Sequence, residues 1–309
     1  MGICFPFFKS DRQKYVQSED PPTHRVDQIH LPTPEFISSL SAWGEYWVLG
    51  QESSISLYTD FTLTRSFDMP ERIRSLCIDS NYIVAGNKEI EVFSYQGKSQ
   101  SKLIGHERVV NSVALNNNLL LSGSSDWTLR LWDVFAQTEL NKNLINWNVV
   151  TSLKWKDQNT AVQTSEDLRL RVWDIREKQI WKSAVFKVGD NFATCCDCSG
   201  DLVVTGHKGC DDDGCEVKLW DLRKNEMIVN TKNHSQSVES VKFVNEKIVS
   251  CGKDGKIIEG KLDGSATDVW THSTCSPFLK MDSFKGGVLA GNLLPQVLFF
   301  NINPLKNEI

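Results

Sequence analysis

The sequence predicts an all-β fold, a propeller with seven blades, and three observations support this prediction. A short apolar strand that ends in Trp-Asp occurs three times, at residues 128–133, 169–174 and 216–221. Aligned strands elsewhere extend the series to seven, with steps of 35 to 47 residues between equivalent positions. An apolar run about 10–15 residues before each position indicates a strand that is buried on both faces. Repeated units of about 40–45 residues are typical of four-stranded propeller blades.

Each predicted blade follows the same order: an apolar strand, a buried strand, a strand that carries the aligned position, and a polar edge strand. The seven aligned positions are Tyr58, Phe93, Trp132, Trp173, Trp220, Gly260 and Phe300. The buried strands before them are residues 46–50, 82–86, 119–123, 160–164, 202–206, 247–251 and 287–291. The Trp-Asp copies are similar to those of WD-repeat proteins, whose propellers usually serve as rigid platforms for other proteins.

The predicted ring needs a strand that closes it, because an open ring would expose strand edges. The segment 25–32 can supply the outer strand of the last blade, which ends near Asn303 with almost no chain left. The sequence therefore predicts one propeller domain over residues 26–303, closed by its N-terminal strand. Residues 1–25, with mixed charges and few aliphatic side chains, are expected to form a flexible tail, and residues 304–309 a short C-terminal one.

The composition and charge of the chain argue against several classes of function. A net charge of −5 and a pI near 5.7 leave no basic footprint for nucleic acid. The sequence has no run of 18 apolar residues, so we expect no spanning helix. Nine cysteines without an export signal indicate reduced thiols in the cytosol. Because no phosphate loop, nucleophile elbow or pair of catalytic carboxylates occurs, we expect no enzyme, no cofactor and no small-molecule substrate.

The third unit contains a complete set of residues for a buried hydrogen-bond relay. His106, in a Gly-His turn, is expected to bond to Asp126 and to Ser122, and Ser122 to accept the indole N–H of Trp132. Each buried polar group then has a partner. A His-Ser-Asp set could also belong to a hydrolase, but Ser122 lies on a blade strand and lacks the G-x-S-x-G turn. The sixth unit repeats the His, Ser and Asp but has Gly260 in place of the tryptophan, so its relay should be incomplete.

The longest step, between Trp173 and Trp220, indicates an insertion in the fifth unit, HKGCDDDGC at residues 207–215. Its histidine and cysteines, together with the cysteines of 195–198, suggest zinc, but the spacing lacks a second close Cys pair. Three consecutive aspartates do not match the alternating ligands of a calcium loop. We therefore expect an exposed loop that contacts partners without a metal. The candidate contact residues are His207, Lys208, Asp211, Asp212 and Asp213.

Arg176 and Arg223 follow two of the Trp-Asp pairs in a W-D-x-R pattern. This pattern resembles the motif by which many propellers dock on the damage-specific DNA-binding protein adaptor of cullin–RING ubiquitin ligases. Either arginine could instead cap the turn that follows its strand. The pattern makes both arginines candidate partner contacts, because arginine is a frequent interface anchor. A substrate receptor of such a ligase is the alternative function.

The first residues, Met-Gly-Ile-Cys, offer two points for lipid attachment. Removal of Met1 leaves Gly2 as an acceptor for myristate, and Cys4 lies where palmitate could follow. One myristoyl chain binds a membrane marginally, and a second chain gives stable anchoring. Pro6 departs from the motif, which has Ser or Thr at that position. The sequence predicts a protein held at a membrane surface through Gly2 and Cys4.

The middle of the chain is similar to the WD repeat-containing protein 31 family. The similarity covers roughly residues 101–243 and is carried by VVTSLKW (149–155), QTSED (163–167) and GCEVKLWDLR (214–223). The resemblance implies a non-enzymatic protein of the cilium, with roles in morphology, intraflagellar transport and BBSome traffic. It also implies a cytoplasmic, membrane-associated location at the cilium or its base, and ciliary trafficking proteins as partners.

Overall fold

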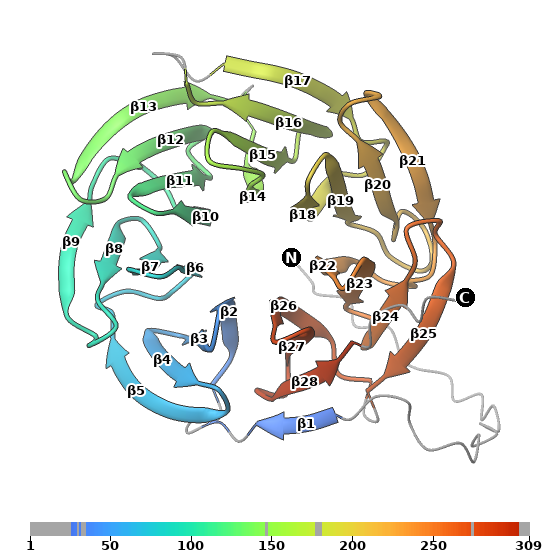
Figure 1. Cartoon of the computed structure of the whole chain (residues 1–309), viewed down its shortest axis with the longest axis horizontal. Helices are drawn as coiled ribbons and strands as arrows, with labels where there is room; N and C mark the ends of the chain where they lie inside the picture. Colours follow the sequence, from blue (N-terminus) through green and yellow to red (C-terminus); the bar gives the residue numbers. More distant parts are fainter. Residues whose placement is uncertain are drawn as a thin grey trace, which may run out of the picture.

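The computed structural model describes residues 26–29, 31, 35–145, 148–176, 181–272 and 275–302. Within them, 28 strands form seven four-stranded antiparallel sheets, arranged as blades around a central axis (Figure 1). The fold is the seven-bladed propeller that the sequence predicts. The two expected tails, with Gly2 and Cys4, lie outside the described part of the chain. That part contains no helix long and apolar enough to cross a membrane.

Six blades run from the inside of the ring to its outside in chain order. The first three consist of β2 (Ile37–Trp43), β3 (Tyr46–Gln51), β4 (Ser54–Thr59) and β5 (Thr62–Asp68); β6 (Ser75–Ile78), β7 (Ile83–Gly86), β8 (Ile90–Phe93) and β9 (Ser99–Leu103); and β10 (Val110–Asn116), β11 (Leu119–Ser124), β12 (Thr128–Asp133) and β13 (Thr138–Leu144). The next three consist of β14 (Val150–Trp155), β15 (Thr160–Ser165), β16 (Arg169–Asp174) and β17 (Trp181–Lys187); β18 (Ala193–Ser199), β19 (Leu202–His207), β20 (Val217–Asp221) and β21 (Glu226–Thr231); and β22 (Val238–Val244), β23 (Lys247–Gly252), β24 (Lys256–Gly260) and β25 (Ala266–Thr271).

The seventh blade closes the ring with a strand from the other end of the domain. It contains β26 (Phe278–Phe284), β27 (Gly287–Asn292) and β28 (Val297–Asn301), and its outer strand is β1 (Val26–Ile29). The register runs antiparallel from Val26 opposite Phe300 to Ile29 opposite Val297. The predicted closing strand is therefore confirmed, and it covers the edge of β28 that would otherwise be free.

The hydrophobic core is divided into seven clusters, and each one lies between two neighbouring blades. The cluster around Trp132, for example, combines Val84 and Val92 of the second blade with Leu120 of the third. The strands that supply these residues are nearly continuous apolar runs because both of their faces are covered. Packing between blades therefore holds the ring together.

Polar contacts join the innermost strands at all seven blade junctions. At five junctions a side-chain oxygen accepts a backbone N–H of the next blade, and at the other two a serine hydroxyl donates to a backbone carbonyl. The pairs are Leu76 N to Ser39, Leu153 N to Ser112, Cys196 N to Ser152, Phe243 N to Asp197 and Ala42 N to Asp282, with Ser75 to Val110 O and Ser240 to Met281 O. These strands line a central cavity of about 610 Å³.

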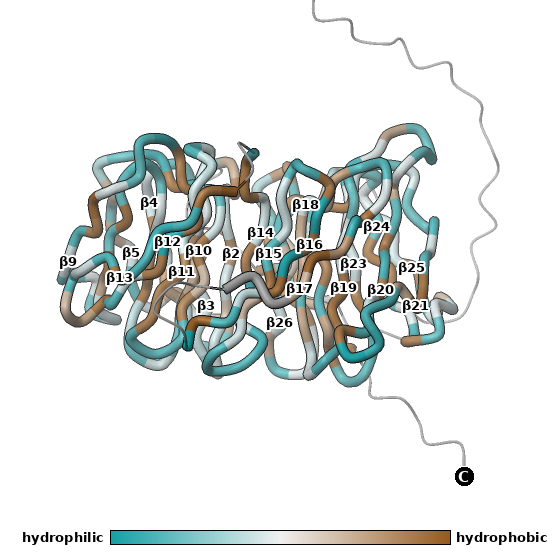
Figure 2. Tube along the Cα trace, turned by 90° about the horizontal axis from the view of Figure 1, so that it is seen from above, coloured by the Kyte–Doolittle hydropathy of each residue, from teal (hydrophilic) through white to brown (hydrophobic). Residues whose placement is uncertain are grey.

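The loops form two opposite faces of the ring. Figure 2 shows the ring from the side, and the loops of both faces are mostly hydrophilic. The His106 face consists of the loops between blades and the turns between the second and third strands of each blade. The Arg176 face consists of the turns after the first and third strands. Val26 pairs with Phe300 at the end of β28, so Val26 and Ile302 both lie at the Arg176 face.

Candidate functional site

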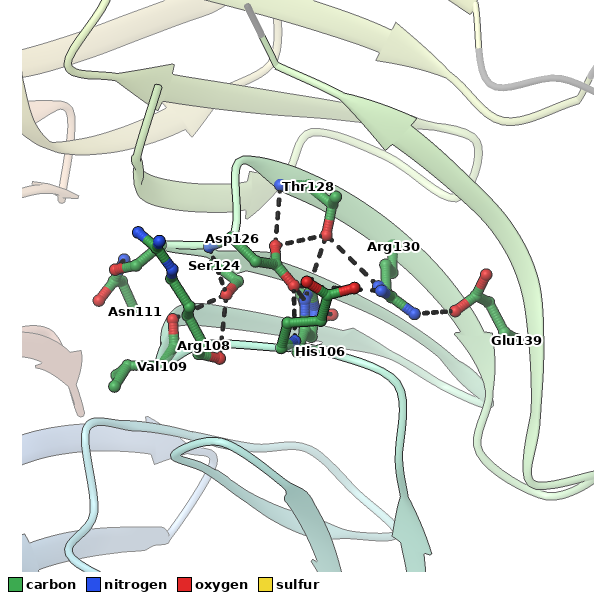
Figure 3. A network of polar contacts seen from close by, with 12 residues as sticks. His106, Arg108, Val109, Asn111, Ser124, Asp126, Thr128, Arg130 and Glu139 are labelled. Carbon is green, nitrogen blue, oxygen red and sulfur yellow. Dashed lines mark hydrogen bonds and ion pairs between the residues drawn. The ribbon is translucent and has the colours of Figure 1, made fainter. Parts of the chain in front are cut away.

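The relay of the third blade joins four residues from two turns and two strands. His106 precedes β10, Asp126 lies between β11 and β12, Ser122 is on β11 and Trp132 is on β12 (Figure 3). His106 Nδ1 lies 2.7 Å from Asp126 Oδ2, and His106 Nε2 lies 2.7 Å from Ser122 Oγ. The indole N–H of Trp132 donates to Ser122 Oγ at 2.8 Å. The structure thus brings together the four residues that the sequence selects for this relay.

The carboxylate of Asp126 determines which atoms of the relay donate and which accept. An ionised carboxylate only accepts, so His106 carries its proton on Nδ1, and its Nε2 accepts from the Ser122 hydroxyl. Asp126 also accepts from the backbone N–H of Glu107 at 3.0 Å and from the hydroxyl of Thr128 at 2.6 Å. Burial alone would raise the pKa of Asp126, but the hydrogen bonds from His106, Thr128 and Glu107 hold it below its ordinary value.

The relay has no access for a substrate. Ser122 is fully buried and Trp132 is 2% exposed, and His106 lies beneath the loop surface at 5%. A catalytic serine must meet its substrate, and this hydroxyl instead accepts an indole N–H inside the blade. The geometry therefore supports the structural interpretation of the His-Ser-Asp set over the hydrolase interpretation.

The sixth blade contains the same relay without its tryptophan. His234 Nε2 lies 2.8 Å from Ser250 Oγ, and His234 Nδ1 lies 3.0 Å from Asp254 Oδ2. Gly260 occupies the aligned position, so no indole N–H reaches Ser250. As in the third blade, burial alone would raise the pKa of Asp254, but the hydrogen bonds from His234 hold this pKa below its ordinary value.

The fifth blade builds a relay from a different histidine, and this corrects the prediction for His207. The indole N–H of Trp220 donates to Thr205 Oγ1 at 3.0 Å, and Thr205 Oγ1 lies 3.0 Å from His207 Nε2. His207 Nδ1 donates to the carbonyl of Asn191 at 3.0 Å. His207 is fully buried as the last residue of β19, so the prediction that it contacts partners is wrong. Burial lowers the pKa of His207 to about 4.

The fourth blade replaces the histidine with an arginine. Arg171 pairs with Asp167 and donates to Ser165 Oγ at 2.9 Å, and both charged side chains are buried. The indole N–H of Trp173 donates to Gln163 at 3.2 Å. Arg171 was not predicted from the sequence, although its place two residues before Trp173 matches that of Arg130 before Trp132 in the third blade.

The rest of the insertion is an exposed turn of the His106 face. Lys208, Asp211, Asp212 and Asp213 are exposed, as the sequence predicts, and Cys215 is buried. Two hydrogen bonds join the loop to the segment before β22 of the next blade. Asp212 N donates to Ser235 O at 2.9 Å, and Gln236 donates to Asp211 at 3.0 Å. In the described part of the chain, no group of three His, Cys, Asp or Glu side chains is arranged to hold a metal.

The two W-D-x-R arginines lie on the Arg176 face. The side chain of Arg176 is 68% exposed and forms a two-point contact with Asp174, with its Nε 2.9 Å from Oδ1. The side chain of Arg223 is 74% exposed, and its Nε lies 3.3 Å from Asp201. Both arginines therefore bind an aspartate beside their own turn and still present guanidinium edges to solvent.

Comparison with solved structures supports the fold. The WD40 β-propeller domain of Doa1 superimposes with a TM-score of 0.75 over 90% of this chain and 96% of that domain, at 18% sequence identity. Residues 97–133, from the turn before β9 to the end of β12, match the family model "WD domain, G-beta repeat". The chain is thus a seven-bladed β-propeller that contains a WD40 repeat. The matched repeat contains all four residues of the His106 relay.

Curated relatives match parts of the chain. Periodic tryptophan protein 2 homolog of Schizosaccharomyces pombe is 32% identical over 124 residues, which is 37% of this chain and 14% of that protein. Protein transport protein Sec31A of Mus musculus is 26% identical over 201 residues, which is 58% of this chain and 15% of that protein. The matches thus span about a seventh of these relatives' own length.

Proposed function

We propose that this WD40 propeller is a non-enzymatic scaffold for protein interactions. The observation that carries the proposal is the contrast between its relays and its loops. The His-Ser-Asp sets are buried and satisfied within the blades, whereas Arg176, Arg223 and the aspartates of 211–213 are exposed on loops. Exposed loops on a rigid frame are where binding residues concentrate in proteins.

The proposed setting of the scaffold is a membrane at the cilium or its base, where it would serve cilium assembly, morphology, intraflagellar transport and BBSome traffic. The resemblance of residues 101–243 to the WD repeat-containing protein 31 family supports this setting. The match to a relative named as a protein transport protein agrees with a role in traffic.

The proposed tether would keep the ring close to the bilayer. Acylation of Gly2 and Cys4 would hold the chain at the bilayer, and Val26, where the propeller begins, lies at the Arg176 face. Because residues 1–25 are expected to be flexible, the tether leaves both faces of the ring available to ciliary partners. The exposed aspartates of 211–213 on the His106 face are candidate contacts.

Two measurements test this function. Mass spectrometry of the mature N-terminus should find myristate on Gly2 and palmitate on Cys4, and Gly2→Ala should move the protein from the membrane fraction to the soluble fraction. Proximity labelling in ciliated cells should recover ciliary trafficking proteins from the wild-type chain. An unmodified Gly2, with an unchanged membrane fraction for Cys4→Ser, would exclude the tether, and a partner set without ciliary proteins would exclude the setting.

The exposure of Arg176 and Arg223 favours one alternative, a substrate receptor of a cullin–RING ligase. In that case the damage-specific DNA-binding protein adaptor should co-purify with the wild-type chain and be lost with Arg176→Ala and Arg223→Ala. Lys224→Ala is the matched control, because Lys224 is a 65% exposed cation in the same turn as Arg223. Equal recovery of the adaptor with all variants, or none with the wild type, would exclude this alternative.

A further inference from the structure

An apolar groove opens at the Arg176 face between the fifth and sixth blades, and we call it the Leu262 groove. It has a volume of about 530 Å³. Its wall includes Leu202, Phe243, Val244, Asn245, Glu246 and Leu262. Three of these, Leu202, Phe243 and Leu262, are large apolar side chains that are partly buried and pack against the cluster between the two blades.

The Leu262 groove presents apolar surface on a face whose loops are mostly hydrophilic (Figure 2). Among the described residues that line it, Glu246 is the only charged one. Soluble proteins rarely leave contiguous apolar surface open to water, and such surface marks a contact with a ligand or with another segment of chain. The groove therefore suits an apolar side chain that is carried by an extended segment.

Ile302, the last residue that the structure describes, lies beside this groove. It is 3% exposed in the cluster between the sixth and seventh blades, and that cluster also contains Val244 of the groove wall. Asn245, the next residue of the wall, donates from its side-chain amide to the carbonyl of Ile302 at 2.7 Å. The same amide donates to the carbonyl of Gly286 at 2.9 Å. The chain therefore leaves the propeller at a fixed point on the edge of the groove.

The sequence after Ile302 supplies an apolar side chain within reach of the groove. Residues 303–309 read Asn-Pro-Leu-Lys-Asn-Glu-Ile. Leu305 comes three residues after the fixed carbonyl, and three residues span at most about 10 Å. A segment on so short a tether has an effective concentration in the millimolar range, so it competes well against a free partner for the same groove. The segment that is best placed to fill the Leu262 groove is therefore part of this chain.

We propose that residues 303–309 dock in the Leu262 groove, with the side chain of Leu305 against the three large apolar side chains of its wall. Lys306 would then lie close to Glu246 at the rim. This inference goes beyond the scaffold function, because it concerns a contact within the chain. A partner that uses this part of the Arg176 face must carry an apolar segment of its own and displace residues 303–309.

Thermal melts of the full chain test the contact. Leu305→Ser should lower the Tm by about 2 °C, because it removes apolar contacts in the groove. In a Leu262→Ser background, where part of the contact surface is already lost, the loss caused by Leu305→Ser should be at least halved, since neighbouring residues are not additive. Asn307→Ser is the matched control in the same segment, and it should leave the Tm unchanged.

Photo-crosslinking identifies the occupant of the groove. Leu305→p-benzoylphenylalanine should form cross-links within the chain to the wall of the groove, located by mass spectrometry, and the same group at position 307 should form fewer. The docking would be overturned by an unchanged Tm for Leu305→Ser or by equal losses in the two backgrounds. Cross-links that are absent, or that lie elsewhere on the ring, on a second copy or on a partner, would also overturn it. Each of these results leaves the scaffold function standing, because proximity labelling tests that function separately.

Discussion

In three blades, one polar side chain on the second strand accepts the indole N–H of the tryptophan on the third strand. Ser122, Gln163 and Thr205 occupy the fourth position of the buried run in three blades, and each accepts the indole N–H of its own blade. Blades with an apolar residue there, such as Ala85 and Ala290, lack the tryptophan as well. The tryptophan on the third strand therefore occurs together with a polar residue on the second strand, because a buried indole N–H needs an acceptor.

Trp132→Ala should lower the free energy of unfolding by about 3–5 kcal/mol, because it empties a large buried site. It also leaves Ser122 without its indole donor. The measurement is urea denaturation of the purified protein, with the exposed Phe135, 76% exposed on the same blade, changed to alanine as control. A loss of less than about 1 kcal/mol for Trp132→Ala would show that the relay is marginal to the blade.

His207 should make the stability depend on pH between its folded pKa of about 4 and the ordinary value of 6.5. In that window the unfolded chain binds a proton that the folded chain does not, so stability is full above pH 6.5 and falls as the pH drops toward 4. The shift corresponds to about 3 kcal/mol.

Denaturant melts of wild type and His207→Gln from pH 7 to pH 4.5 test this dependence. The variant should show a flatter profile across the window. The carboxylates Asp126 and Asp254, whose pKa values are lowered, add their own loss of stability only below about pH 4. Parallel profiles for the two proteins would contradict the assignment.

At the scale of the element, repeated patterns predict the strands well and single residues less well. The aligned positions from Tyr58 to Phe300 all fall on third strands, and the closing strand was predicted from the shortage of chain after β28. His207 was misassigned because the longer step of the fifth unit suggested that the insertion begins there. Thr205 and Trp220 were the signal for a buried histidine, since they match Ser122 and Trp132.

The insertion should act in binding more than in stability. Replacing Asp211, Asp212 and Asp213 with asparagine keeps the backbone bond from Asp212 to Ser235 and removes the exposed charge, so the Tm should change little. Proximity labelling should then lose partners. Lys253→Gln, an exposed change on the next blade, is the control. An unchanged partner set would show that the acidic turn does not contact partners.

At the scale of the whole molecule, closure of the ring depends on a four-residue strand. Ile29 is 6% exposed and packs with Ile37, Trp47 and Val297, so it joins the first and last blades. Gln28, its neighbour on β1, is exposed. The strand thus has one face that holds the ring and one that faces solvent.

Ile29→Asp should destabilise the protein by at least about 2 kcal/mol, because it places a charge among apolar side chains. Gln28→Asp should lie within about 0.5 kcal/mol of the wild type. Melting temperature and size-exclusion chromatography measure the effect, and Ile29→Asp should also aggregate through the uncovered edge of β28. Similar stability of the two variants would show that closure does not depend on β1.

The pairing of β1 with β28 also determines when the ring can close during translation. Val26 leaves the ribosome first among the strand residues, and its partner Phe300 is on the last strand to emerge, so the seventh blade cannot form until translation of the domain is complete. Six blades can pair locally before that moment, because each is a run of consecutive hairpins. The nascent propeller is then an unclosed ring with an exposed edge, the form in which such chains are prone to misassociate. Chaperones that hold nascent chains are therefore expected to act on this protein at the end of its synthesis, before β1 has paired with β28.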